Sequence, residues 1–117
     1  MLPKKFRLKK RIAFKLTYRV KHSSHSGGII LFAGIEKKDE TIPTRVGFVV
    51  SKKVHKRAVK RNRLKRLMRE SYRLLLKDNN LFNSQKFVSL VFVGSEKALG
   101  KNFSEIKHYV TKTLEKI

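Results

Sequence analysis

Cysteine is absent from this 117-residue sequence. Disulfide scaffolds, zinc knuckles and thiol nucleophiles are therefore excluded. The four histidines are scattered and do not form a metal site by themselves. Two of them, His22 and His25, lie in a stretch rich in serine and glycine, which favours a solvated loop over a metal site. The sequence predicts no metal site in the protein.

Acidic residues are scarce. The chain has 8 Asp and Glu residues against 30 Lys and Arg residues, which gives a formal net charge of +22. A compact fold carries so much charge of one sign only when counter-charge is available, so we expect a polyanionic partner. Disorder is not expected, because hydrophobic residues make up 40% of the chain and fall into periodic segments.

Long hydrophobic runs are missing. No stretch approaches the roughly 20 apolar residues of a membrane-spanning helix. Residues 1–5 also lack the apolar core of a signal peptide. We therefore expect a cytoplasmic protein without a membrane partner.

Patterns typical of a hydrolytic centre are missing too. The sequence has no pair of carboxylates, no histidine with an obvious base partner and no phosphate-binding glycine loop. We expect no catalytic residue in the protein itself.

Residues 9–21 are predicted to form the first helix. Aliphatic side chains recur on one side of this helix and are expected to face the core. They are Ile12, Ala13, Leu16 and Val20. Phe14 and Tyr18 are four residues apart and project away from that side, so their rings need a second environment.

Three short apolar segments are predicted strands, namely residues 29–33, 45–51 and 86–93. A serine- and glycine-rich break at residues 22–28 precedes the first of them. The first two are expected to pair as an antiparallel hairpin, with a loop longer than the commonest hairpin turns. The third is apolar enough to have both faces covered.

A long basic segment, residues 52–77, is predicted to form an amphipathic helix that ends at residues 78–80. Its apolar stripe consists of Leu64, Leu67, Met68, Ser71 and Leu75. The opposite side carries Asn62, Arg66, Arg69 and Arg73, with Arg63 and Lys65 on the flanks.

The last helix is predicted to follow Asn102, because Asn102 and Glu105 together resemble a helix-capping pair. The order helix, two or three strands, helix, strand, helix indicates an α+β or α/β sandwich with helices packed on a small sheet. We expect a single domain over residues 1–117, with a short basic arm at residues 1–8.

The basic segment indicates nucleic-acid binding. Repulsion among its charges opposes folding, and phosphates would neutralise them and release counterions. A basic face that is merely solvated is the alternative, but acidic partners are nearly absent. Charge alone does not separate RNA from DNA. A DNA-architectural protein is less favoured, because no recognition helix or dimer seam stands out.

Two segments carry a more specific pattern. Residues 61–70 read Arg-Asn-Arg-Leu-Lys-Arg-Leu-Met-Arg-Glu, and residues 46–53 read Val-Gly-Phe-Val-Val-Ser-Lys-Lys. Together they closely resemble the signature of the bacterial ribonuclease P protein family, whose helix carries an Arg-Asn-Arg-x-x-Arg core. Residues 6–10 and 13–14 resemble the family's entry into its first helix, so the resemblance covers most of the chain.

The resemblance implies an αβββαβα sandwich similar to a domain of ribosomal protein S5, with a left-handed crossover around the basic helix. General handedness rules would predict a right-handed one. The implied function is that of the protein subunit of ribonuclease P, which removes 5′ leaders from precursor tRNA. Mg²⁺ held mainly by the RNA subunit would supply the catalysis.

The implied partners are therefore the catalytic RNA and precursor tRNA, with no obligate protein partner. A structural ribosomal or other RNA-binding protein is the alternative that composition alone favours.

In this family the basic helix and the loop before it contact the catalytic RNA. The corresponding residues here are Lys52, Lys53, Lys56, Arg57, Lys60, Arg61, Asn62, Arg63, Lys65, Arg66 and Arg69. Asn62 has a second possible role, because its amide could tie the start of the helix to a backbone group.

The family's second RNA surface is a cleft between the first helix and the sheet, which holds the single-stranded 5′ leader. By position it falls on Phe14, Tyr18 and Phe32, with Lys52 and Lys53 nearby. Aromatic rings beside a basic groove stack unpaired bases with about 1–3 kcal/mol per base, and core packing is the alternative. Many family members have a basic residue at the exit of the last strand, where this chain has Val93 and Gly94.

Overall fold

A computed structural model of the chain describes residues 2–117. Three helices and four strands follow one another in the order αβββαβα that the resemblance implies. The helices are α1 (Arg11–Arg19), α2 (Ala58–Lys77) and α3 (Phe103–Lys116). The strands are β1 (His22–Ser26), β2 (Ile29–Ala33), β3 (Arg45–Val49) and β4 (Ser89–Gly94).

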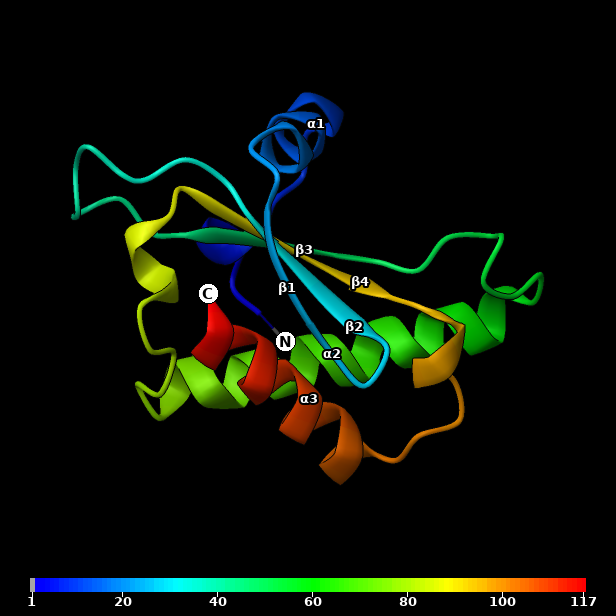
Figure 1. The fold of residues 1–117 in the computed structure, drawn as a ribbon. Helices are drawn as coiled ribbons and strands as arrows, with labels where there is room; N and C mark the ends of the chain where they lie inside the picture. The colour runs from blue at the N-terminus through cyan, green and yellow to red at the C-terminus, as the bar shows by residue number, and fades with distance from the viewer. Residues whose placement is uncertain (1) are drawn as a thin grey trace.

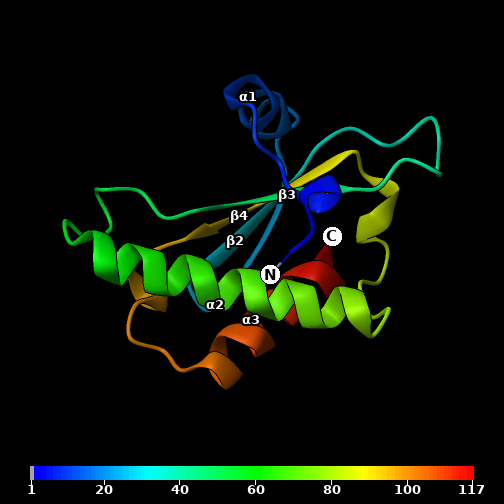
Figure 2. The same ribbon diagram turned by 180° about the vertical axis from the view of Figure 1, so that it is seen from behind.

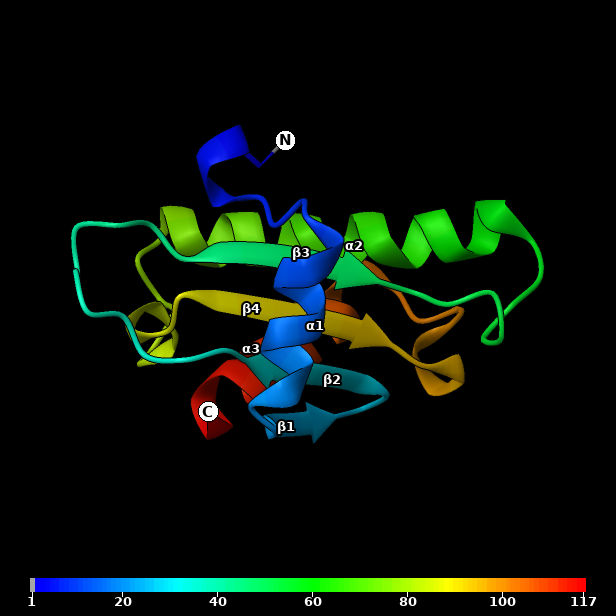
Figure 3. The ribbon, with the colours of Figure 1, turned by 90° about the horizontal axis from the view of Figure 1, so that it is seen from above.

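The strands form one sheet with the order β1-β2-β4-β3. β2 is antiparallel to both β1 and β4, whereas β3 is parallel to β4. α2 and α3 cover one face of the sheet, and α1 crosses the other face alone (Figures 1 and 2). The connection from β3 through α2 to β4 is left-handed, as Figure 3 shows with α2 behind the sheet. The resemblance therefore predicted the crossover correctly, and the general rule did not.

The main core lies between the sheet and the two helices α2 and α3. Its buried helical side chains are Leu64, Met68, Leu75, Ile106, Val110 and Leu114. Phe92 of β4 stacks on Phe48 with ring centroids 5.6 Å apart, and Tyr72 of α2 meets Phe92 edge-on at 5.8 Å. The apolar stripe predicted on α2 is thus the face that packs, and α3 packs through its own apolar face.

The two core helices begin in different ways. α3 has the predicted capping box, in which the Glu105 amide donates to Asn102 Oδ1 at 2.9 Å and the Asn102 amide donates to Glu105 Oε1 at 3.3 Å. α2 begins at Ala58 rather than at residue 52. A run of positive charge does not define a helix start, and the chain before Ala58 forms turns, one of them closed by the Val54 amide on the Ser51 carbonyl oxygen.

Residues 22–26 form strand β1, although the sequence predicts a loop there. β1 is an edge strand of polar residues, so it lacks the apolar alternation that marks most strands. The buried Ser24 hydroxyl donates to the Thr113 carbonyl oxygen of α3 at 2.7 Å. Gly27 and Gly28 join β1 to β2 with φ of 55° and 91°, as a tight two-residue hairpin turn requires.

The predicted hairpin between residues 29–33 and 45–51 is wrong. β4 lies between β2 and β3, where Phe92 is opposite Leu31 on one side and Phe48 on the other. β4 is buried along nearly its whole length, which suits the centre of a sheet. The connection from β2 to β3 must therefore pass the end of β4, and this path accounts for the length of the connection.

The predicted core face of α1 is also wrong. Ile12, Leu16 and Val20 are 63%, 51% and 39% exposed, and Ala13 is partly exposed. α1 is apolar on two sides, and periodicity alone does not decide which side packs on the sheet.

The aromatic side of α1 packs on the sheet instead. The Phe14 ring lies over Gly47 of β3, where a Cβ atom would come within 2.4 Å of the ring. Tyr18 meets Phe32 of β2 edge-on, with ring centroids 4.9 Å apart. A wide ring fills the space above a glycine, so Gly47 selects the aromatic side.

Candidate RNA-binding surface

The eleven residues predicted to bind RNA all lie on α2 and on the loop before it, which we call the α2 face. They are Lys52, Lys53, Lys56, Arg57, Lys60, Arg61, Asn62, Arg63, Lys65, Arg66 and Arg69, and all are exposed or partly exposed. The two ion pairs within residues 2–117 are Glu70–Arg73 and Lys112–Glu115. The α2 face therefore has no internal counter-charge.

Glu70 is the one acidic residue of α2, and Arg73 already neutralises it. Arg73 donates from Nε to both carboxylate oxygens, at 3.2 and 3.1 Å. This hydrogen bonding lowers the pKa of the Glu70 carboxyl group. Glu70 therefore stays ionised and remains paired with the positively charged Arg73. Glu70 therefore provides no free counter-charge for the arginines on the α2 face.

Arg61 holds the loop in place as well as adding charge. Its Nη1 donates to the carbonyl oxygens of His55 and Lys56, each at 2.8 Å. Hydrogen bonds from a charged donor are stronger than neutral ones. Arg61 therefore fixes the turn that leads into α2.

Two further arginines have identifiable neighbours. Arg63 Nη2 donates to the Lys101 carbonyl oxygen at 3.1 Å, which ties α2 to the segment before α3. The Arg69 guanidinium lies 5.9 Å from the centroid of the Phe48 ring, within the range of a cation–π contact. Asn62 is exposed, and no described residue hydrogen-bonds its amide, so the structural role considered for it falls to Arg61.

The N-terminus of α2 is suited to an anion. No acidic residue lies in its first turn, and no side chain caps it from Arg57. The Arg57 amide is instead bonded to Nδ1 of His55 at 3.0 Å. A hollow of about 280 Å³ beside this turn is lined by His55, Lys60, Arg63, Leu99 and Gly100. The partial positive charge of a helix start adds to these side chains, so a phosphate group fits here.

The predicted leader residues divide into two groups. Phe14, Tyr18 and Phe32 come together under α1, and each is partly exposed. Burial raises the pKa of Tyr18, so its ring is neutral at physiological pH. Lys52 and Lys53 lie on the exposed segment after β3, which runs beyond the end of the sheet (Figure 3).

The short basic arm at residues 1–8 packs against the rest of the fold. Leu2 is fully buried, and the Leu8 amide donates to the Val46 carbonyl oxygen at 2.9 Å, so the arm covers the open edge of β3. A small hollow of about 150 Å³ on this edge brings Arg7 of the arm together with Phe14 and Arg69. The alternation of apolar and basic residues at positions 6–9 was the available signal.

Metal binding by the protein itself does not fit this surface. No three potential metal-ligating side chains come together within residues 2–117. The α2 face is cationic and would repel a divalent cation. As for membranes, none of the helices described is long and apolar enough to cross one.

Comparison with known proteins gives a consistent result. A family model described as ribonuclease P matches residues 2–117. The ribonuclease P protein component of Clostridium novyi is 36% identical over 115 residues, covering 98% of this chain and 96% of the relative. That of a Synechococcus strain is 36% identical, covering 99% of this chain and 84% of the relative.

Solved structures show the same fold. The RNase P protein from Staphylococcus aureus superposes with a TM-score of 0.74 at 23% identity, covering 98% of this chain and 91% of that protein. The RNase P protein from Thermotoga maritima gives 0.70 at 22% identity, with 95% and 96% covered. The crossover, the unpaired basic α2 face and the family match lead to one assignment: the chain belongs to the ribonuclease P protein family.

Proposed function

We propose that this chain binds the catalytic RNA of ribonuclease P through the α2 face and thereby supports removal of 5′ leaders from precursor tRNA. The observation that supports this most directly is the set of eleven polar and basic side chains without a carboxylate partner, arranged around an uncapped helix start. Phosphates supply the missing counter-charge, and release of their counterions drives association.

The second part of the proposal concerns the leader. Phe14, Tyr18 and Phe32 form a partly exposed aromatic surface on the face of the sheet opposite α2. Such rings stack unpaired bases with little sequence preference, as a site for varied leaders requires. Lys52 and Lys53 lie on a segment that can follow the sugar-phosphate backbone of the same RNA leader.

In this proposal the protein positions RNA and carries out no bond cleavage. Mg²⁺ bound by RNA supplies the activated water when the holoenzyme is assembled. The side chains of the α2 face neutralise phosphates, and the aromatic surface holds the leader in a fixed place. We expect this to occur in the bacterial cytoplasm, where precursor tRNA is made.

The test is cleavage of a leader-bearing precursor tRNA by a bacterial ribonuclease P RNA at low Mg²⁺, with and without the protein. A double variant, Lys60→Ala with Arg66→Ala, removes two charges from the α2 face. Its control, Lys38→Ala with Lys107→Ala, removes two charges from other parts of the surface. We expect strong stimulation by the wild type and the control, and a loss of about tenfold or more in RNA affinity for the double variant.

Two results would contradict the proposal. Tight RNA binding by the wild type without stimulation of cleavage would indicate a structural RNA-binding protein. Equal behaviour of the two double variants would show that net charge, and not the α2 face, determines binding.

A further inference from the structure

The outer side of α1 carries apolar side chains that the proposed function does not use. Leu16 and Val20 of α1 lie next to Ile35 and Val88, and all four are among the exposed large hydrophobic residues of the described chain. Contiguous apolar surface of this kind marks an interaction site more often than a chance exposure.

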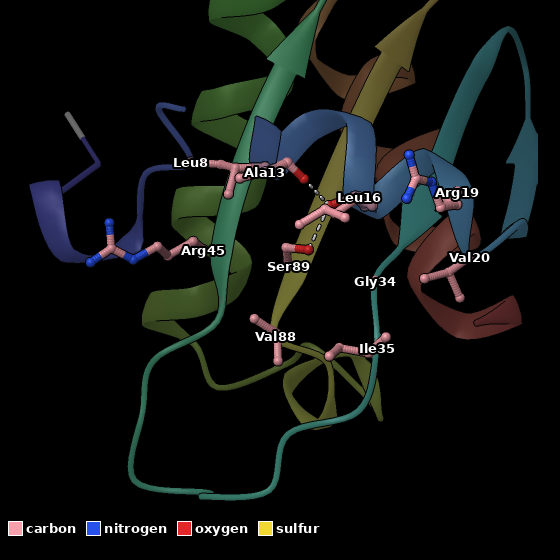
Figure 4. Close-up of a pocket in the computed structure, with 11 residues that line it drawn as sticks. Leu8, Ala13, Leu16, Arg19, Val20, Gly34, Ile35, Arg45, Val88 and Ser89 are labelled. Atoms are coloured by element: carbon pink, nitrogen blue, oxygen red, sulfur yellow. Dashed lines mark hydrogen bonds between the residues drawn. The ribbon is translucent and has the colours of Figure 1, made fainter. Parts of the chain in front are cut away.

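These four side chains line a pocket of about 430 Å³, which lies between α1, the end of β2 and the start of β4 (Figure 4). The volume falls within the range of small-ligand sites. We call it the α1 pocket. Its remaining lining residues are Leu8, Ala13, Thr17, Arg19, Gly34, Arg45 and Ser89.

The α1 pocket is separate from the aromatic surface proposed for the leader. Phe14 lies over Gly47 and Tyr18 lies against Phe32, and the register places Gly47 and Phe32 opposite the same residue of β4, Val91. Arg45 and Ser89 of the pocket are opposite one another two residues earlier along β3 and β4. The two sites thus occupy opposite flanks of α1.

The hydroxyl groups on the floor of the pocket have no free proton to donate. The Thr17 hydroxyl donates to the Ala13 carbonyl oxygen at 2.8 Å, so the Ser89 hydroxyl, 2.6 Å away, donates to Thr17. The Gly34 amide is bonded to the Ser89 carbonyl oxygen at 2.8 Å. A ligand that fits here presents an apolar face and needs no specific polar contact.

The rim of the pocket is cationic. Arg19 and Arg45 lie on opposite sides, and Figure 4 shows the Arg45 guanidinium extending outward. Neither arginine belongs to an ion pair with another described residue. The sequence has no Asp or Glu before Glu36, so α1 itself carries only positive charge, and Glu36, which follows Ile35, is the acidic residue next to the pocket in the sequence. A second copy of the chain would bring the same charge and be repelled.

We propose that the α1 pocket binds one unstacked nucleotide of RNA. The base lies against Leu16, Val20, Ile35 and Val88, and the adjoining phosphates meet Arg19 and Arg45. Bases taken out of a stack are held in this way between apolar side chains, with charge contacts to the flanking backbone. Because the hydroxyl protons of the floor are already used, the pocket offers no side-chain donor that would select one base over another. This proposal rests on the proposed function, which supplies the RNA.

Two isoleucines make a matched test. Ile35 is in the pocket and 64% exposed, whereas Ile42 is 53% exposed on the same β2–β3 connection but outside the pocket. Ile35→Glu and Ile42→Glu change the net charge equally. In the assembled holoenzyme, we expect Ile35→Glu to weaken binding of the catalytic RNA or of precursor tRNA by about tenfold or more, the value of one lost base contact. Ile42→Glu should stay near the wild type, and equal effects would overturn the proposal.

The absence of cysteine allows a second measurement. Ile35→Cys and Ile42→Cys each provide one attachment point for a benzophenone crosslinker. We expect position 35 to crosslink to a few unpaired nucleotides and position 42 to do so far less. Equal crosslinking, or a dimer in sedimentation that Ile35→Glu abolishes while RNA binding is unchanged, would refute the nucleotide site.

Stimulation of cleavage by the wild-type protein, measured in the same reactions, separates the two proposals. If the wild type stimulates and the two isoleucine positions behave alike, the nucleotide site alone is refuted. If the wild type fails to stimulate, the ribonuclease P function is refuted, and the crosslinks still decide whether the pocket takes a nucleotide.

Discussion

Arginines that are equivalent in the sequence pattern have different surroundings on α2. Arg61 donates to two backbone carbonyl oxygens of the preceding loop. Arg66 is exposed, and its guanidinium is bonded to no described residue. A guanidinium has several donors in a fixed plane, whereas an ammonium is a point charge, so the two positions should differ in their tolerance of lysine.

We expect Arg61→Lys to lower the free energy of unfolding by about 1 kcal/mol, because the loop loses a charged donor to its carbonyl oxygens. Arg66→Lys keeps the charge at a free position and should change stability by only a few tenths of a kcal/mol. Thermal unfolding and binding to ribonuclease P RNA check both variants. Equal responses at the two positions would show that Arg61 does not hold the loop.

Tyr72 gives a pH dependence of known direction. Burial raises its pKa from 10.0 to about 12, against a smaller opposing effect of the hydrogen bond from Gln85. The folded state therefore favours the neutral phenol. The stability that the neutral Tyr72 phenol gives to the folded state is complete below pH 10 and is lost as the pH rises from 10 to about 12.

Tyr72→Phe should therefore reduce the steepness of alkaline unfolding over this pH range. A shift of this size corresponds to about 2 to 3 kcal/mol. Tyr109→Phe removes a hydroxyl from a partly exposed ring and serves as the control. The check is the free energy of unfolding in denaturant between pH 9 and about 12, and an unchanged slope in Tyr72→Phe would contradict the prediction.

The position on α2 of the residues proposed to bind RNA could be predicted from the sequence, but their contacts could not. The resemblance placed all eleven on one helix and its loop, and the structure has them there. It did not show that Arg63 reaches the Lys101 carbonyl oxygen, because that partner lies far along the chain. A guanidinium's partner depends on the folded backbone, and no local pattern encodes it.

At the scale of elements, one glycine determines how α1 sits on the sheet. The Phe14 ring occupies the space above Gly47, and the other side of α1 stays exposed. The orientation of α1 in turn places the aromatic surface and the α1 pocket on its two flanks. A side chain at position 47 should therefore disturb both sites.

We expect Gly47→Ala to destabilise the protein by about 1–3 kcal/mol, because the new Cβ atom overlaps the Phe14 ring. Combining it with Phe14→Ala removes the overlap, so the double variant should be more stable than the sum of the single changes predicts. Chemical denaturation of the four proteins gives this coupling. Strict additivity would show that the ring does not press on position 47.

The elements themselves were mostly predictable, and their pairing was not. Periodicity identified α1 and α2, the capping pair identified α3, and three of the four strands came from apolar runs. β1 was missed because its five residues are polar and its place is secured by the Ser24 hydroxyl. The hairpin was mispredicted because sequence order suggests neighbours, whereas the apolar β4 takes the centre of the sheet.

At the scale of the molecule, charge is distributed unevenly around a compact core. Both faces of the sheet carry basic helices, and acidic residues are confined to a few positions after residue 35. Mutual repulsion opposes folding across the whole chain. Ligands that bind only the folded state counteract this repulsion, because their binding shifts the folding equilibrium by mass action.

We expect the isolated protein to be partly unfolded at low ionic strength and to fold when sulfate or phosphate is added. An anion present at about 100 times its dissociation constant stabilises the folded state by about 2.7 kcal/mol. Circular dichroism at constant ionic strength, with chloride compared against sulfate, measures the effect. A spectrum that the anions leave unchanged would contradict it.

The central position of β4 fixes the order of assembly during synthesis. Until residues 89–94 have left the ribosome, β2 and β3 lack the strand that joins them, and only the β1–β2 hairpin of the sheet can form. The sheet therefore closes late in translation. By then the α2 segment has already emerged with its charges unneutralised, and ribosomal RNA is the nearest polyanion. Under the proposed function, ribosomal RNA and the catalytic RNA therefore compete for the same helix during synthesis.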